Sequence, residues 1–204
     1  MRIIAGTHRG RPILAPRDAK TTRPITDRVK ESLFNRLASL GMLDEEPAWH
    51  ALDVFSGTGS LGLEALSRGA STCTFVDHDR DAVERLRQNL NQLSLNDRAH
   101  IVHGSALAGY WSAGLAHKPV RIAFLDPPYP LARDERQRDM LLKLVGSLAA
   151  VIEPGGIALV RTPSEVGLPE LPGYDGPAPL DYSGMRLHFY QTPLDGLELE
   201  ENRA

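Results

Sequence analysis

The chain reads Leu52-Asp53-Val54-Phe55-Ser56-Gly57-Thr58-Gly59-Ser60-Leu61-Gly62 about a quarter of the way along. An apolar strand runs here into a glycine-rich turn and then into a helix, as in a nucleotide-binding unit. Gly57 and Gly59 let the backbone approach a ligand closely. The next apolar run, residues 71–76, is followed by Asp77, where an acid can bind the two hydroxyls of a ribose. The stretch therefore predicts an α/β sheet with a nucleoside-containing cofactor, either NAD or S-adenosylmethionine.

A second motif, Asp126-Pro127-Pro128-Tyr129, follows the apolar run 120–125. The two prolines end the expected strand because neither can donate to a ladder. The Asp126 carboxylate and the Pro127 carbonyl then form a rigid pair of acceptors beside the exposed ring of Tyr129. A planar base with an exocyclic amine suits this cluster, with its N–H groups on the acceptors and its face on the ring. A plain proline-rich turn is the alternative for this motif taken alone.

Strand and helix signals alternate along the rest of the chain, and 204 residues fit one domain. The fold class predicted is α/β: a Rossmann-like, doubly wound, mostly parallel seven-stranded sheet with an antiparallel closing strand. Strands are expected at 50–55, 71–76, 99–103, 120–125, 156–161, near 178–183 and at 185–190. Helices are expected at 27–40, 60–68, 79–93, 134–151 and briefly near 105–115. Thr26 is the expected N-cap of the first helix, and residues 163–180 are expected to form a long loop.

Charge is distributed unevenly: residues 1–36 carry a net charge of +6, and the remaining residues carry −9. We therefore expect a basic N-terminal arm over residues 1–26, a catalytic domain over 27–192 and an acidic tail over 193–204. A basic arm on an acidic body is typical of a nucleic-acid contact, because phosphates supply most non-specific affinity. The alternative is a solvated charged segment with no partner.

Composition excludes several other classes. No stretch approaches the roughly 18 continuous apolar residues of a membrane span, and the N-terminus lacks a signal-peptide core. Cys73 lies in an apolar strand without a partner, so we expect a core residue and no disulfide. Seven histidines and one cysteine show no zinc-ligand spacing, so no metal is expected. These features predict a cytoplasmic protein without a membrane contact, and we expect a monomer.

Taken together, the two motifs resemble those of S-adenosylmethionine-dependent amino-methyltransferases. The opening segments are similar, more specifically, to the bacterial family that methylates N2 of a guanine in small-subunit (16S) ribosomal RNA. The residues that carry this closer match are Met1 to Gly6, His8 to Arg11, Thr22 to Asn35, Leu52 to Gly69 and Asp126 to Tyr129. The resemblance implies a class I methyltransferase fold, S-adenosylmethionine as cofactor, and 16S ribosomal RNA within an assembling or assembled small subunit as partner.

The carboxyl ends of the strands should gather the site, because ligands of open α/β sheets bind there. The expected catalytic residues are Asp126, Pro127 and Tyr129. The expected cofactor-binding residues are Thr26, Arg28, Asp53, Phe55, Ser56, Gly57, Thr58, Gly59, Asp77, His78, Ser105, Ala106 and Asp126. The expected RNA-binding residues are Arg2, Arg9, Arg11, Arg17, Arg23 and Tyr129. Ser105 departs from the acid that related enzymes often use to hold the adenine.

Four other functions compete with guanine-N2 methylation of ribosomal RNA. DNA adenine-N6 methylation uses the same Asp-Pro-Pro-Tyr chemistry, but direct reading of DNA usually needs elements that enter a groove. Only the N-terminal arm and the 163–180 loop lie outside the expected sheet and helices and could enter a DNA groove. Protein glutamine methyltransferases typically carry Asn at the position of Asp126. A nicotinamide oxidoreductase leaves Asp126 to Tyr129 unexplained, and a non-catalytic RNA-binding module leaves the cofactor motif unexplained.

Overall fold

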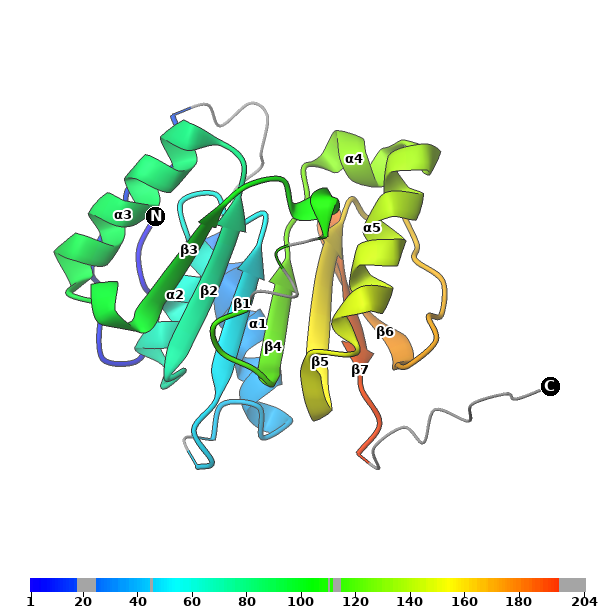
Figure 1. The fold of residues 1–204 in the computed structure, drawn as a ribbon, viewed down its shortest axis with the longest axis horizontal. Coiled ribbons are helices and arrows are strands. Elements are labelled where there is room, and N and C mark those ends of the chain that lie inside the picture. The colour runs from blue at the N-terminus through cyan, green and yellow to red at the C-terminus, as the bar shows by residue number, and fades with distance from the viewer. Residues whose placement is uncertain (18–24, 45, 110, 112–114, 195–204) are drawn as a thin grey trace.

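A computed structural model describes residues 1–17, 25–44, 46–109, 111 and 115–194. It shows one seven-stranded sheet flanked by helices (Figure 1). The strands are β1 (His50–Val54), β2 (Thr72–Asp77), β3 (Ala99–His103), β4 (Val120–Leu125), β5 (Ile152–Thr162), β6 (Asp175–Tyr182) and β7 (Met185–Gln191). Their order is β3-β2-β1-β4-β5-β7-β6. Strands β1 to β5 pair in parallel, while β7 pairs antiparallel with both β5 and β6. The predicted fold class is confirmed.

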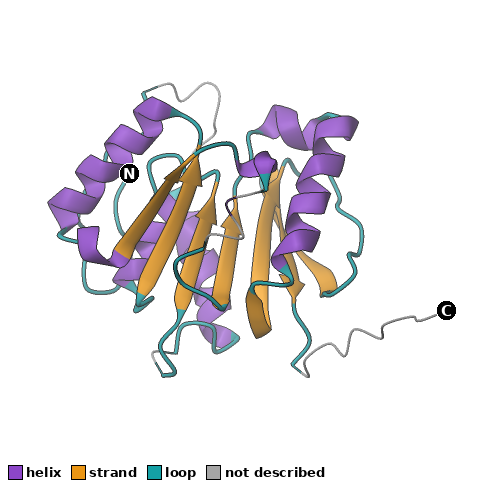
Figure 2. Ribbon diagram, in the orientation of Figure 1, coloured by secondary structure: helices purple, strands orange, loops and turns teal. Residues whose placement is uncertain are grey.

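Helices cover both faces of the sheet (Figure 2). They are α1 (Asp27–Ser39), α2 (Ser60–Ser67), α3 (Arg80–Leu93), α4 (Tyr129–Arg133) and α5 (Glu135–Leu148), with single 3-10 turns at Asn96–Arg98 and Ala106–Ala108. Thr26 caps α1 as predicted, because its side chain accepts a hydrogen bond from the Val29 amide. Each of the first three helices ends within one residue of its predicted bounds.

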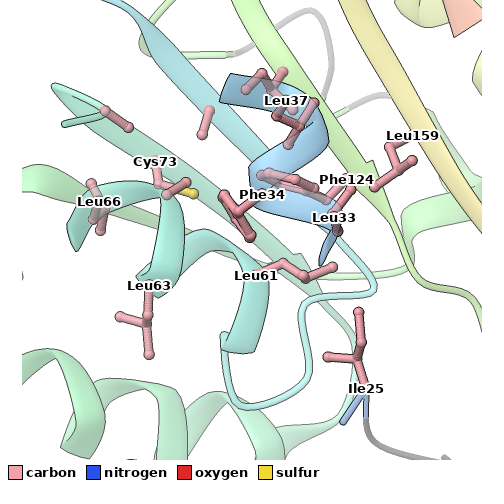
Figure 3. Packing of buried hydrophobic residues seen from close by; sticks show 14 of the residues in the cluster. Ile25, Leu33, Phe34, Leu37, Leu61, Leu63, Leu66, Cys73, Phe124 and Leu159 are labelled. Atoms are coloured by element: carbon pink, nitrogen blue, oxygen red, sulfur yellow. The ribbon is translucent and has the colours of Figure 1, made fainter. Parts of the chain in front are cut away.

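Two apolar cores lie on opposite faces of the sheet, because successive strand residues point to opposite sides. One core contains residues of α1, α2 and α3 together with alternate strand residues such as Phe75, Phe124 and Leu159. Phe34 of α1 meets Phe124 of β4 in this core, with ring centroids 5.6 Å apart (Figure 3). The other core packs α5 against the opposite side of β4 and β5. Cys73 is buried in the first core, as predicted.

Two predicted element bounds are wrong. The helix expected at 134–151 is α5, which begins one residue later because Asp134 is its extended N-cap (φ −71°, ψ 124°) and accepts a bond from the Gln137 amide. It ends three residues early, at Leu148, and the short helix α4 before it was not predicted. The fifth strand starts at Ile152 rather than at residue 156. Residues 153–156 form a bulge there, since Ile152 pairs with Val120 and Ile157 pairs with Ile122. The glycines of this bulge were expected to form a turn before the strand.

The loop after β5 is also shorter than expected, because β6 begins at Asp175. The predicted helix near 105–115 is a single 3-10 turn at Ala106–Ala108, and residues 110 and 112–114 lie outside the described part of the chain. The acidic tail lies outside it from residue 195 onward.

The N-terminal segment packs against the domain. Ile3 and Ile13 are buried in the same core as α1, α2 and α3. The Ile4 and Ala5 amides donate to the Glu64 carboxylate of α2, at 2.8 and 3.0 Å. The structure therefore does not separate the described part of the predicted arm from the catalytic domain. The domain boundary at residue 26 stays a prediction.

Candidate cofactor and catalytic site

A pocket of about 400 Å³ lies over the carboxyl ends of the parallel strands. That volume falls in the range of small-molecule sites. Its walls come from the N-terminal segment, the turn after β1, the end of β2, the start of α3 and the end of β4. The lining residues are Pro16, Arg17, Phe55, Gly57, Asp77, His78, Asp79, Asp81, Ala82, Arg85, Asp126 and Pro128.

The turn after β1 forms one wall of the pocket and is hydrogen-bonded to the end of β2. The Gly57 amide donates to Asp77 Oδ2 at 2.6 Å, and the Asp79 amide donates to Asp77 Oδ1 at 2.8 Å. Each carboxylate oxygen can accept a second hydrogen bond, so Asp77 can still bind ribose hydroxyls. Phe55 has φ +61°, a conformation that costs a non-glycine residue free energy and is found disproportionately at functional sites. The structure brings Phe55, Gly57, Asp77 and His78 together, as predicted from the sequence.

The three glycines of the motif have different environments. A Cβ on Gly57, which has φ +53°, would meet nothing within 4 Å. A Cβ on Gly59 would lie 2.5 Å from Leu86 Cδ1, and one on Gly62 would lie 2.3 Å from Phe75 Cε1. Gly57 is therefore the glycine that faces the pocket, while Gly59 and Gly62 let α2 pack closely against its neighbours. The sequence had placed Gly59 beside the ligand.

Asp53 stabilises the motif from inside the protein. It is 2 % exposed and does not line the pocket, and its Oδ2 accepts the Gly62 amide at 2.8 Å. Burial raises the pKa of Asp53 well above its ordinary value, an effect that the Gly62 hydrogen bond opposes. Asp53 was expected among the cofactor-binding residues, and the structure gives it a contact with the start of α2 instead.

Ser56 and Thr58 complete the turn. Both side chains are buried, and the Thr58 carbonyl accepts a bond from the Asn89 amide of α3. Among the described residues, no hydrogen-bond partner is found for the buried Ser56 Oγ. A buried hydroxyl without a partner is costly, but Ser56 does not line the pocket, so its contact with the cofactor stays a prediction.

Asp126 borders the pocket directly after β4, the strand that pairs with β1. Its side chain is 20 % exposed, and Arg161 Nε of β5 lies 2.5 Å from its Oδ1. The sheet register explains this contact: Leu125 pairs with Val160, so the next residues of the two parallel strands stand side by side. Burial raises the pKa of Asp126, while the adjacent Arg161 guanidinium lowers it.

Tyr129 differs from its prediction. The ring was expected to be exposed, but it is half-buried at the start of α4, and its hydroxyl is buried. Two guanidinium groups lie near the ring, that of Arg161 at 5.4 Å and that of Arg133 at 5.7 Å from its centroid. Arg133 also forms an exposed ion pair with Glu165. The cause is the short helix α4, which turns Tyr129 back toward β5.

Eight residues expected to contact the cofactor do not line the pocket: Asp53, Ser56, Thr58 and Gly59 of the motif, and Thr26, Arg28, Ser105 and Ala106 outside it. Thr26 and Arg28 are exposed at the start of α1. Ser105 is exposed, whereas Ala106 is buried and its carbonyl accepts the Trp111 indole N–H at 2.8 Å. Their assignment to the cofactor stays a prediction.

Sequence reasoning missed three basic groups of the site: Arg85, Arg161 and, as a pocket residue, Arg17. Arg85 donates to the Ala15 carbonyl at 3.1 Å and lines the pocket. Arg17 lies across the pocket mouth and pairs with Asp81 at 3.3 Å. Only Arg161 had a signal in the sequence, namely a charged residue at the carboxyl end of an otherwise apolar strand.

Most of the arginines predicted to bind RNA are exposed on the N-terminal segment. Arg2 pairs with Asp27 at 2.9 Å, Arg11 donates to the Gln92 carbonyl at 3.2 Å, and Arg9 is exposed. Arg23 lies outside the described residues. Within the described ranges, no cluster of three or more His, Cys, Asp or Glu is arranged for a metal ion. In the same ranges no helix is long and apolar enough to cross a membrane.

Comparison with known proteins adds a family. The model of a family described as "Conserved hypothetical protein 95" matches residues 1–177. The chain is 37% identical over 174 residues to "Ribosomal RNA small subunit methyltransferase D" of Escherichia coli (strain K12), which covers 84% of this chain and 79% of that protein. The chain belongs to this methyltransferase family. The family resemblance seen in the sequence is thereby confirmed.

Two further relatives agree with this membership. The chain is 36% identical to "Putative rRNA methyltransferase YlbH" of Bacillus subtilis (strain 168), over 85% of this chain and 88% of that protein. Among solved structures, "Putative methyltransferase yhhF from Escherichia coli" superposes with a TM-score of 0.74 at 32% identity, covering 95% of this chain and 98% of that chain. The class I methyltransferase fold of the methyltransferase D family is thus shown for this chain.

Proposed function

We propose that this chain transfers a methyl group from S-adenosylmethionine to the exocyclic N2 of a guanine in small-subunit (16S) ribosomal RNA. The observation that carries the proposal is the position of Asp126. Its carboxylate borders the same pocket as Gly57 and Asp77, although the three residues lie far apart in the sequence. Gly57 and Asp77 thus suit a nucleoside cofactor, and Asp126 on the same pocket suits an amine.

The residues present fit S-adenosylmethionine. Gly57 would hold the cofactor against the backbone, because no side chain stands between the turn and the pocket. Asp77 would bind the ribose hydroxyls with the carboxylate that borders the pocket. When bound, the cofactor supplies a methyl group already activated on a sulfonium. The remaining task of the protein is to align the amine with that methyl group.

Asp126 and Pro127 would present the amine. An exocyclic amine is a poor nucleophile because its lone pair is delocalised into the ring. The Asp126 carboxylate would accept one N–H and the Pro127 carbonyl the other, which turns the lone pair toward the methyl carbon. Transfer would form the nitrogen–carbon bond and break the sulfur–carbon bond, whose electron pair would stay on sulfur. Asp126 takes the proton that the methylated nitrogen loses, and water removes it afterwards.

Tyr129 would stack on a base splayed out of the RNA. The half-buried ring has Arg133 and Arg161 as neighbours, of which only Arg133 is exposed. An incoming base would therefore displace Arg133 from the ring and leave Arg161 in place. The loss of the Arg133–Glu165 pair would cost little, since exposed ion pairs contribute about 0–1 kcal/mol.

The relatives' names and the basic N-terminal segment favour RNA over DNA as the substrate. "Ribosomal RNA small subunit methyltransferase D" names the ribosomal small subunit, and Arg2, Arg9 and Arg11 are exposed on the segment. A ribosomal particle would present the target nucleotide in a defined shape, so the protein would need no element for a DNA groove. A ribosomal substrate would also place the protein in the cytoplasm.

Asp126→Ala tests the assignment of the chemistry. We expect single-turnover methyl transfer to fall at least about 100-fold, because the acceptor and the proton sink are removed together. Calorimetry should show S-adenosylmethionine bound with nearly wild-type affinity, since Asp77 and Gly57 are untouched. Glu84→Ala, which removes an exposed carboxylate of α3 outside the pocket lining, is the control and should retain transfer. A near-normal rate for Asp126→Ala would refute the role proposed for Asp126.

A further inference from the structure

Arg161 contacts both functional residues of the Asp-Pro-Pro-Tyr motif. Its Nε lies 2.5 Å from Asp126 Oδ1, and its guanidinium carbon lies 5.4 Å from the centre of the Tyr129 ring. The side chain is only 5 % exposed. The position follows from the fold, because β5 runs parallel to β4 and places Arg161 next to Asp126 in register.

Stability alone does not account for this ion pair. Taking a guanidinium and a carboxylate out of water is expensive, and a pair of well-packed apolar residues is often as stable or more stable. In the middle of the two strands the facing residues are apolar, for example Phe124 beside Leu159. The strands also carry the Arg121–Glu153 ion pair at their other end, so it is the contact of Arg161 with a pocket residue, Asp126, that points to the chemistry of the site.

Several charged groups surround Asp126. Repulsion between Asp126 and Asp53 of β1 is part of what raises the pKa of Asp53, and Asp77, Asp79 and Asp81 line the same pocket. Arg17 and Arg85 line the same pocket from the N-terminal segment and α3. Burial raises the pKa of Asp126, and the opposing effect comes from Arg161 through its charge and its hydrogen bond.

We propose that Arg161 is a positioning residue, which keeps the Asp126 carboxylate ionised and fixes its plane toward the target amine. The inference rests on the proposed function. Only an ionised carboxylate can accept an N–H bond with either oxygen and then take up a proton. The bond from Nε also limits rotation of the carboxylate. Arg161 itself touches neither the amine nor the cofactor in this role.

A direct test follows the ionisation of Asp126 without any activity assay. The 13C resonance of the Asp126 carboxyl carbon, assigned with Asp126→Asn, is titrated by NMR in the wild type and in Arg161→Gln. We expect the Asp126 midpoint to move to higher pH in Arg161→Gln, because the cause that lowers the pKa is removed. Arg161→Lys keeps the charge and should show a smaller move. Arg133→Gln is the matched control: it removes the other guanidinium beside Tyr129, and it should leave the midpoint unchanged.

Activity provides a second readout. The acid limb of the pH profile of single-turnover methyl transfer should move to higher pH in Arg161→Gln, in parallel with the NMR midpoint. The affinity for S-adenosylmethionine should stay unchanged. Raising the pH should restore part of the reduced rate, which a merely structural defect would not allow.

The wild-type protein alone keeps the inference testable if Arg161→Gln does not fold. Its Arg161 Nε–H resonance should titrate with the same midpoint as the Asp126 carboxyl carbon. An Asp126 midpoint that does not rise in folded Arg161→Gln, or an Nε–H resonance that does not follow Asp126, would overturn the role of Arg161. A correct NMR result without methyl transfer to ribosomal RNA would leave Arg161 as the partner of Asp126 and refute the proposed function instead.

Discussion

The individual glycines of the glycine-rich turn have different roles: one serves ligand binding and the others serve packing. Gly57 faces the pocket, whereas Gly62 faces Phe75 and Cys73 at distances that leave no room for a side chain. The motif alone could not separate these roles, because all three glycines satisfy the same spacing. Only the packing of α2 against β2 distinguishes them.

Gly57→Val should abolish S-adenosylmethionine binding, because it places a side chain where the cofactor is expected. The left-handed backbone at Gly57 adds a cost of about 1–2 kcal/mol for a non-glycine residue. Gly10→Val is the matched control, since Gly10 has φ +81°, has open space around it and lies outside the pocket. Calorimetry should detect binding to Gly10→Val and none to Gly57→Val. Equal affinities of the two variants for S-adenosylmethionine would show that the 55–59 turn does not bind the cofactor.

At this scale the sequence predicted the residues that belong to local motifs. Gly57, Asp77 and Asp126 each follow an apolar strand directly, and the topology of a parallel sheet brings strand ends together. Arg161 and Arg85 could not be assigned in this way. Their contacts depend on the register of β5 and on the approach of the N-terminal segment to α3, which no short motif encodes.

Among the elements, the N-terminal segment depends on one buried acid of α2. Glu64 is fully buried and accepts the amides of Ile4 and Ala5 and the Arg68 guanidinium, while Lys30 lies 3.5 Å away. Lys30 in turn donates to the Arg2 carbonyl at 2.7 Å. A charge pattern could identify residues 1–36 as basic, but it could not show that Ile3 and Ile13 belong to the core.

Glu64→Ala should destabilise the protein by about 3–5 kcal/mol, because it leaves the buried Lys30 ammonium without its counter-charge. Two backbone amides of the N-terminal segment lose their acceptor as well. Glu84→Ala serves as the control, since Glu84 pairs with Arg87 only at the surface, and it should cost less than about 0.5 kcal/mol. Urea unfolding measures both changes. A loss below about 1 kcal/mol for Glu64→Ala would show that the segment is held by its apolar contacts alone.

Element types were predictable wherever apolar periodicity was long, as in α3 and β4. The bounds were harder to predict. The helix α5 ends three residues before its predicted end, and the 153–156 bulge extends β5 back to Ile152. The pairing of Ile152 with Val120 is a tertiary contact, which no local signal in the sequence encodes.

Over the whole molecule, the N-terminal segment is basic and the remaining residues are acidic. We therefore expect the N-terminal segment to bind RNA phosphates. Changing Arg2, Arg9 and Arg11 together to Gln should weaken RNA binding. The slope of log affinity against log salt should fall by roughly 0.7–0.9 for each phosphate that the variant no longer neutralises. Arg17 is left intact because it lines the cofactor pocket. Deletion of residues 1–20 would remove Ile3 and Ile13 from the core and would not isolate the charge effect.

The control for that variant removes the same charge elsewhere. Arg36, Arg136 and Lys143 are exposed on α1 and α5, so their joint change to Gln gives an equal net charge. Affinity measured between two salt concentrations should then stay close to wild type. Identical salt slopes for the two triple variants would show that the N-terminal segment has a structural role and does not bind RNA phosphates.

The identity of the methylated nucleoside tests the central claim most directly. Purified protein and labelled S-adenosylmethionine are incubated separately with 30S subunits, free 16S ribosomal RNA and duplex DNA, and each product is digested and analysed by mass spectrometry. Asp126→Ala runs beside the wild type to exclude a contaminating activity. We expect label in N2-methylguanosine from ribosomal RNA, with none in DNA and none with Asp126→Ala. Label in N6-methyladenine from DNA, with no label in ribosomal guanosine, would contradict it.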